Sequence, residues 1–154
     1  MEKGITVTFI GHRECPGVAY DKLCSAIRWC IEQGAIEFLS GGMGTFDWMA
    51  ARAVCELKKE YPSVQNTLVI PYLSFKIQER SYFDCILYPE GFERYHFKAA
   101  IPARNRYMVD HAQIAICYID HDWGGAFKTY ERAQKKGLQV INLGELEMQA
   151  VNHD

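Results

Sequence analysis

IEFLSGGMGTFD, at residues 36–47, decides the fold because it passes from one kind of secondary structure to another through a glycine loop. Residues 36–40 are mostly apolar and β-prone, which predicts a strand. Three glycines mark the turn at 41–44, and apolar side chains then recur at helical spacing as far as Leu57. The stretch therefore predicts a strand, a tight turn and a helix, in that order.

The same alternation continues in both directions along the chain. Apolar, β-prone segments predict strands at residues 5–10, 36–40, 67–72, 85–88, 114–119 and 140–143. Apolar stripes of helical period predict helices at about residues 23–31, 45–57, 103–111 and 126–136. Strands that alternate with helices, several of them apolar on both faces, are typical of parallel sheets. The predicted fold class is therefore α/β, a Rossmann-like three-layer fold with a mainly parallel central sheet.

Length and composition predict a single domain. A chain of 154 residues with 49% hydrophobic residues can cover a sheet on both faces, and no linker or repeat divides it. We expect the domain to span residues 1–146 and the tail 147–154 to fray. Residues 89–102 are rich in aromatic and charged side chains without a clear period, so we expect a loop over the ligand site there.

Charge and cysteine usage limit the partners and the compartment. Seventeen basic against 19 acidic residues give a net charge of −2, so no overall field would draw the chain to nucleic acid or to an anionic membrane. No apolar run is long enough to cross a bilayer, and the start of the chain lacks a signal-peptide core. The six cysteines form no C-x-x-C pair, which favours reduced thiols. We therefore expect a soluble, cytoplasmic protein without a membrane partner.

Ligands of open parallel sheets bind beyond the carboxyl ends of the strands, so the residues that follow strands are the candidates for a site. A phosphate or carboxylate can meet backbone N–H groups and a helix N-terminus at Ser40, Gly41, Gly42, Gly44 and Thr45. The alternative is a simple tight turn, because the spacing matches neither a Walker A loop nor G-x-G-x-x-G. Asp47 would repel a phosphate, so it either accepts hydrogen bonds from a ribose or base or supports the helix N-terminus.

Three further segments carry anion-binding types of residue at the same predicted edge. The residues are Gly11, His12 and Arg13 after the first strand, Arg104, Asn105 and Arg106, and the second glycine turn with Gly124, Gly125, Lys128 and Thr129. We expect Arg104 to stand at a helix start, where guanidinium groups and free N–H groups act on one anion. The alternative is a solvated basic turn paired with Asp110 or Glu93. The hypothesis is that Gly11, Gly42, Arg104 and Gly125 converge on one pocket.

The histidines show no H-x-x-x-H spacing, so the sequence predicts no metal site and no required cofactor. Asp120 and Asp122 could hold a magnesium ion through the phosphate of a ligand, because such sites combine carboxylates with substrate oxygens.

Two of these segments resemble the superfamily that joins the DNA-processing protein DprA to the LOG enzymes, known as SLOG, and most closely its YpsA-like branch. SGGMGTFD at 40–47 is similar to the Ser-Gly…Asp turn of DprA, and IPARNR at 101–106 to its proline and Arg-Asn-Arg segment. The LOG enzymes carry an arginine upstream of a P-G-G-x-G-T-x-x-E turn, to which Arg104 and Glu131 correspond. Trp123, Phe127 and Lys128 replace the proline, the third glycine and the threonine of that turn.

The resemblance implies a nucleotide-binding Rossmann-like domain, in which Arg104 and Glu131 would be catalytic if the chain were a hydrolase. The altered glycine turn favours binding of a phosphate-bearing nucleotide or nucleotide-derived ligand, in sensing or signalling, over turnover. The first alternative is an N-glycosidic hydrolase acting on nucleoside monophosphates. The second is DprA-like binding of single-stranded nucleic acid by basic and aromatic side chains, namely Lys98, Arg104, Arg106, Lys128, Tyr95, Phe97 and Trp123. Exposed aromatics near residues 88–97 make a homodimer or higher homo-oligomer compatible with each.

Overall fold

The computed structural model describes residues 4–146, so the predicted tail 147–154 lies outside the described residues. Six strands form one sheet, in the order β4-β3-β2-β1-β5-β6, and every neighbouring pair is parallel. The elements are β1 (Ile5–Gly11), α1 (Tyr20–Glu32), β2 (Ala35–Ser40), α2 (Gly44–Leu57), β3 (Gln65–Val69), η1 (Arg80–Tyr82), β4 (Cys85–Leu87), η2 (Phe92–Arg94), α3 (Phe97–Asp110), β5 (Ile114–Tyr118), α4 (Gly125–Lys135) and β6 (Gln139–Asn142). The predicted α/β class, the parallel sheet and the single domain are confirmed.

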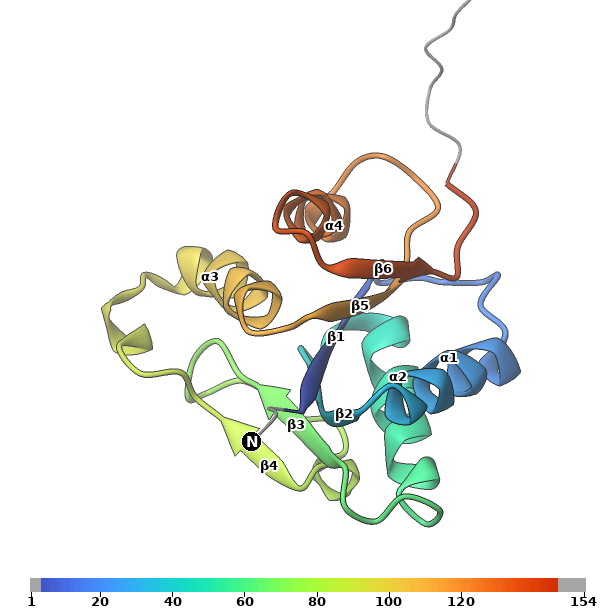
Figure 1. Ribbon diagram of the computed structural model, residues 1–154. Helices are drawn as coiled ribbons and strands as arrows, with labels where there is room; N and C mark the ends of the chain where they lie inside the picture. Colours follow the sequence, from blue (N-terminus) through green and yellow to red (C-terminus); the bar gives the residue numbers. More distant parts are fainter. Residues whose placement is uncertain (1–3, 147–154) are drawn as a thin grey trace, which may run out of the picture.

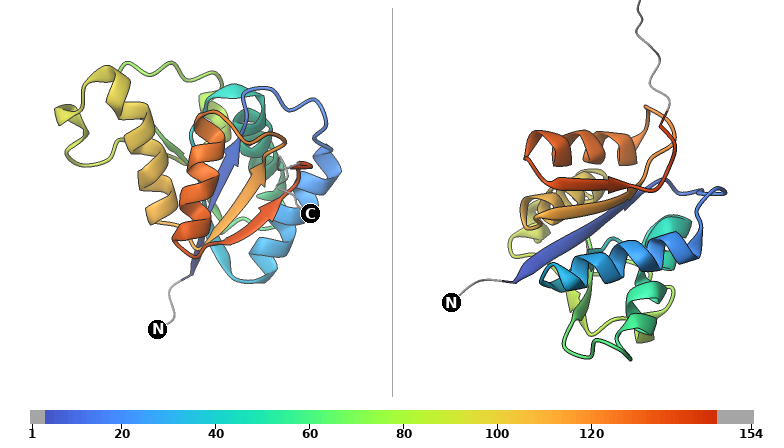
Figure 2. Two further views of the ribbon diagram at one scale, coloured as in Figure 1. Left: turned by 90° about the horizontal axis from the view of Figure 1, so that it is seen from above. Right: turned by 45° about the vertical axis from the view of Figure 1, so that its right-hand side comes forward.

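Helices cover both faces of the sheet, because the central strands carry apolar side chains on both faces. Figure 1 shows α1 and α2 together on one side of the strands, with α3 and α4 on the other, and Figure 2 shows the same layers from above and from the side. In β5, Ile114 and Ile116 join the core under α1 and α2, while Ala115 and Cys117 join the core under α4. Because successive side chains of a strand point to opposite faces, an unbroken apolar run feeds both cores.

The third helix begins earlier than the sequence predicts. The sequence predicts a start at about residue 103, after a loop over residues 89–102, but α3 starts at Phe97 and contains Pro102. His96 caps this helix, because its Nδ1 accepts a hydrogen bond from the Lys98 N–H at 3.2 Å. A proline removes one N–H donor and strains a helix, but burial of the apolar face of α3, including Ala100 and Met108, outweighs that cost. The predicted loop is thus limited to the segment around η2.

The six cysteines are free, and Cys15, Cys30 and Cys117 are buried. Burial raises the pKa of the Cys30 thiol to about 12, which keeps it protonated. None of the helices within residues 4–146 is long and apolar enough to cross a membrane.

Candidate functional site

A cavity of about 820 Å³ opens at the carboxyl edge of the sheet, a volume within the range of small-molecule sites. Its walls come from the residues after β1 and β5, from the starts of α2 and α4, and from the middle of α3. The chain runs from β1 outward in one direction through β2, β3 and β4, and in the other through β5 and β6. The cavity therefore lies at the topological switch point between β1 and β5, where open parallel sheets bind ligands.

The structure brings together about half of the residues predicted for the site. The residues that line the cavity are Gly11, His12, Arg13, Asp47, Arg104, Asn105, Gly124, Gly125 and Thr129. The residues that do not line it are Ser40, Gly41, Gly42, Gly44, Thr45, Arg106, Lys128 and Glu131. Of the four residues expected to converge, Gly42 is the exception. Glu14, Met43, His121 and Trp123 also line the cavity. The available signal was their position next to predicted site residues: Glu14 follows Arg13, Met43 lies within the first glycine turn, and Trp123 directly precedes the second. His121 had no such signal beyond its place in the loop after the fifth strand.

Asp47 is the buried carboxylate of the cavity. Its side chain belongs to the first turn of α2, is 8% exposed, and accepts a hydrogen bond at Oδ2 from the Met43 N–H at 3.0 Å. Burial raises its pKa to about 6, although the Met43 hydrogen bond and the positive charge of Arg104 act in the opposite direction. A carboxyl group that titrates near neutral pH in a cavity can accept hydrogen bonds from sugar hydroxyls or base N–H groups, or exchange a proton.

The raised pKa of Asp47 predicts a pH-dependent stability. The unfolded side chain titrates near 3.9, so the folded state holds this proton more tightly, and stability is lost as pH rises through about 6. Relative to Asp47→Asn, which cannot ionise, the wild-type free energy of unfolding should fall by about 2–3 kcal/mol from about pH 4 to pH 7. Urea denaturation of both proteins across this range measures the difference, and parallel curves would contradict a raised pKa.

Arg104 is a buried clamp between loops. Its side chain is 2% exposed, and its Nη1 donates to the carbonyl oxygens of Gly41 at 2.7 Å and Val69 at 2.9 Å. Nε donates to Asn105 Oδ1 at 2.9 Å. The guanidinium group thus ties the end of β3 to the loop that follows β2.

The expectation that Arg104 stands at a helix start is wrong, because it lies in the eighth position of a 14-residue helix. Its backbone N–H therefore belongs to the helix and cannot add to an anion site. Arg106 is exposed and lies outside the cavity. The alternative pairing with Asp110 is also not seen, since Asp110 binds Arg132 and Lys136.

The glycine loop 41–44 is more closed than the sequence suggests. Gly41 and Gly42 are buried, and two N–H groups at the start of α2 are already bonded, that of Met43 to Asp47 and that of Thr45 to the Arg13 carbonyl at 2.8 Å. Both bonds satisfy donors that a phosphate cradle would need free. Within this loop only Met43 lines the cavity, so the loop offers fewer free N–H groups to an anion than the sequence suggests.

The start of α4, in contrast, opens into the cavity. Gly124 caps the helix without a side-chain bond, no acidic residue occupies the first turn, and the first helical bond runs from the Lys128 N–H to the Gly124 carbonyl. A Cβ atom added at Gly125 would meet no atom within 4 Å. N–H groups at a helix start carry a partial positive charge, so this is the freer of the two predicted anion cradles.

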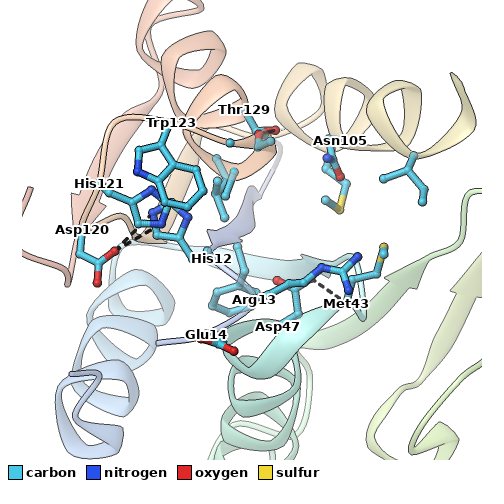
Figure 3. A pocket seen from close by; sticks show the side chains of 18 of the residues that line it. His12, Arg13, Glu14, Met43, Asp47, Asn105, Asp120, His121, Trp123 and Thr129 are labelled. Atoms are coloured by element: carbon cyan, nitrogen blue, oxygen red, sulfur yellow. Dashed lines mark hydrogen bonds and ion pairs between the residues drawn. The ribbon is translucent and has the colours of Figure 1, made fainter. Parts of the chain in front are cut away.

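Aromatic rings from two loops stack at the rim of the cavity. His12 and His121 have ring centroids 3.5 Å apart, and His121 and Trp123 are 3.9 Å apart. Figure 3 shows the three rings side by side, with Asp120 next to the two imidazoles. Burial and the neighbouring His121 lower the pKa of His12. Trp123 is 68% exposed and presents a free ring face near the start of α4.

Glu131, the carboxylate that the LOG resemblance assigns to catalysis, lies on α4 away from the cavity. It lines a smaller depression with Lys128, Arg132, Lys135 and Lys136. Glu131 and Arg104 therefore do not share a site, and Lys128 does not reach the cavity wall. Thr129, unlike Lys128 and Glu131, does line the cavity. It lies one helical turn after Gly125, and residues four positions apart share a helix face.

Solved structures with a similar fold include DNA processing proteins and a structural genomics target. DNA processing protein A from Helicobacter pylori, whose structure concerns its single-stranded DNA binding mode, is 19% identical with a TM-score of 0.63, over 90% of this chain and 65% of that one. DprA from Streptococcus pneumoniae is 21% identical with a TM-score of 0.66, over 90% of this chain and 50% of that one. TM1055 is 13% identical with a TM-score of 0.57, over 88% and 72%.

These similarities show the fold, and this chain spans half to two thirds of the DNA processing proteins. No curated protein matches the sequence. Fold and cavity together define a Rossmann-like domain with a ligand-sized site at the switch point of its sheet. The sequence matches the YpsA model, the YspA SLOG family, over residues 18–147, which is most of the chain. The chain belongs to this family, and the predicted SLOG membership is confirmed.

Proposed function

We propose that the chain binds a phosphate-bearing nucleotide or nucleotide-derived small molecule in this cavity, in a sensing or signalling role. The observation that carries the proposal is the position of the cavity, at the switch point of a parallel sheet and directly before the open start of α4. A phosphate group fits there because Gly124 and Gly125 leave space for close backbone approach.

The remaining walls suit the sugar and the base. Asp47, on the opposite side from Asn105 and Thr129 in Figure 3, offers acceptor oxygens for hydroxyl or amine donors. Trp123 offers an exposed aromatic face beside the proposed phosphate position, and nucleobases stack on such faces at a gain of about 1–3 kcal/mol. The carboxylates of Glu14 and Asp120 would repel a phosphate, so we expect that group to lie toward α4.

Gly125→Asp tests the phosphate position. An acidic side chain in the first turn favours the helix and fits the open space at Gly125, so the protein should fold, but its charge would repel the ligand phosphate. We expect Gly125→Asp to weaken a nucleoside monophosphate at least about 10-fold relative to Gly125→Asn, and to leave the nucleoside unaffected. Calorimetric titration measures both, after native mass spectrometry of the purified protein has identified a co-purified nucleotide.

Equal affinities of Gly125→Asp and Gly125→Asn would contradict phosphate binding at α4. The same samples distinguish the alternatives. Release of free base from the monophosphate would make the chain an N-glycosidic hydrolase, in which Asp47 rather than Glu131 is in the cavity. Tight, strongly salt-dependent binding of single-stranded DNA would favour the activity named for the Helicobacter pylori protein, by charges outside the cavity.

A further inference from the structure

Three side chains with metal-binding atoms meet at the rim of the cavity, although they come from two distant loops. His12 follows β1, and Asp120 and His121 follow β5, the neighbouring parallel strand. The Nε2 atoms of His12 and His121 lie 3.5 Å and 3.8 Å from the same oxygen, Oδ1 of Asp120. One ligand atom from each of the three residues lies within 4.8 Å of the others. The dashed lines beside Asp120 in Figure 3 mark its contacts with the two histidines.

The buried member of this group lacks a hydrogen bond. His12 is 7% exposed, and its Nε2 has no hydrogen-bond partner among the described residues. Nδ1 of His121 is also buried without one. Buried polar atoms are nearly always satisfied, so an unpaired imidazole nitrogen that points at a carboxylate indicates a missing partner. A cation between the three side chains would supply it.

We propose that His12, Asp120 and His121 bind a divalent transition metal ion such as Zn²⁺, with its remaining coordination position facing the cavity. Two imidazoles and one carboxylate favour such ions over magnesium, which prefers oxygen ligands alone. Ligand atoms at about 2.0–2.1 Å from a tetrahedral metal are about 3.3–3.5 Å apart. The two distances to Asp120 Oδ1 are close to this separation.

Metal binding needs one ring to tilt. The imidazoles of His12 and His121 are stacked 3.5 Å apart with 13° between their planes, so their in-plane nitrogen lone pairs lie in nearly parallel planes and do not converge on one ion. His12 is buried, whereas the side chain of His121 is 30% exposed and can rotate. Because Trp123 stacks on His121, the tilt changes the surroundings of the indole ring. Trp123 therefore reports on occupancy of the site.

The experiment titrates the metal-free protein with Co²⁺, which replaces Zn²⁺ and absorbs visible light when bound. In a buffer without phosphate or nucleotide, we expect one equivalent to bind, with visible bands, no thiolate-to-cobalt charge-transfer band, and a change in tryptophan fluorescence. Trp123→Phe should keep the affinity and lose most of the fluorescence change. This readout does not depend on the proposed nucleotide ligand, so the two proposals fail independently.

His121→Ala is the decisive variant, because the residue is partly exposed and its loss spares the core. Even groups that only support metal ligands change affinity by about 10–100-fold, so we expect removal of a ligand to weaken Co²⁺ at least about 100-fold. The matched control is His111→Ala, an exposed histidine at the end of α3 that stacks on Tyr107. Absence of binding in the wild type, equal binding by His121→Ala, or a thiolate band would each overturn the proposal.

Discussion

Arg104→Ala is expected to lower the free energy of unfolding by about 3–5 kcal/mol, since hydrogen bonds to charged groups contribute about 1.5–3 kcal/mol each and this side chain makes several in the interior. The substitution leaves the Gly41 and Val69 carbonyls without the Arg104 donor and opens a space beside Phe75, whose ring centroid lies 5.8 Å from the guanidinium carbon. Urea denaturation followed by circular dichroism measures the loss.

Arg106→Ala is the matched control for this prediction. The two arginines are two residues apart on α3, yet Arg106 is exposed and outside the cavity. Its removal should change the free energy of unfolding by no more than about 0.5 kcal/mol. If Arg104→Ala kept wild-type stability and lost only phosphate affinity, the guanidinium would act on the ligand. Its structural role between the Gly41 and Val69 carbonyls would then be contradicted.

Gly42→Val is expected to destabilise the protein by about 2–6 kcal/mol, which is a large share of the roughly 5–15 kcal/mol that stabilises an ordinary domain. Gly42 has a φ of +66°, a conformation that costs a branched residue about 1–3 kcal/mol. A Cβ atom there would lie 2.7 Å from Leu68 Cδ1 and 3.4 Å from the rings of Phe75 and Trp48, so overpacking adds about 1–3 kcal/mol. Leu68 is fully buried and cannot move aside cheaply.

Gly137→Val separates these two contributions. Gly137 also has a positive φ, of +81°, but a Cβ atom there meets nothing within 4 Å. Its substitution should therefore cost only the backbone strain, about 1–3 kcal/mol. The difference between the two valine variants in urea denaturation gives the steric part. If both lost the same stability, Gly42 would act as a turn residue alone, with no packing role.

The order of strands and helices could be predicted from local patterns, because each element carries its own period. The apolar run at 114–119 and the stripe beginning at Phe46 specify a buried strand and an amphipathic helix without knowledge of their partners. The start of α3 could not be predicted in this way, because Pro102 is a strong local sign of a helix boundary. Tertiary packing of the helix outweighs that sign.

The location of the cavity followed from the sequence, whereas the contacts of the residues around it did not. Parallel strands bring their carboxyl ends to one edge, so the residues after β1 and β5 had to lie near one another once the fold class was known. That reasoning places His12, Gly124 and Gly125 correctly beside a common cavity. The same reasoning does not determine which of the two glycine turns keeps free N–H groups. At the first turn the Met43 N–H is bonded to Asp47 and the Thr45 N–H to the Arg13 carbonyl, and only the folded structure shows these bonds.

The sequence by itself thus determined a parallel α/β sheet and the edge at which its cavity opens, since these depend on the period of side chains along each element. Only the tertiary structure decided that Arg104 points inward to two carbonyl groups, that Asp47 is buried, and that His12 meets His121 and Asp120. Such contacts depend on helix rotation and loop paths. Helix rotation and loop paths are determined jointly by residues far apart in the sequence, so no local sequence pattern predicts these contacts.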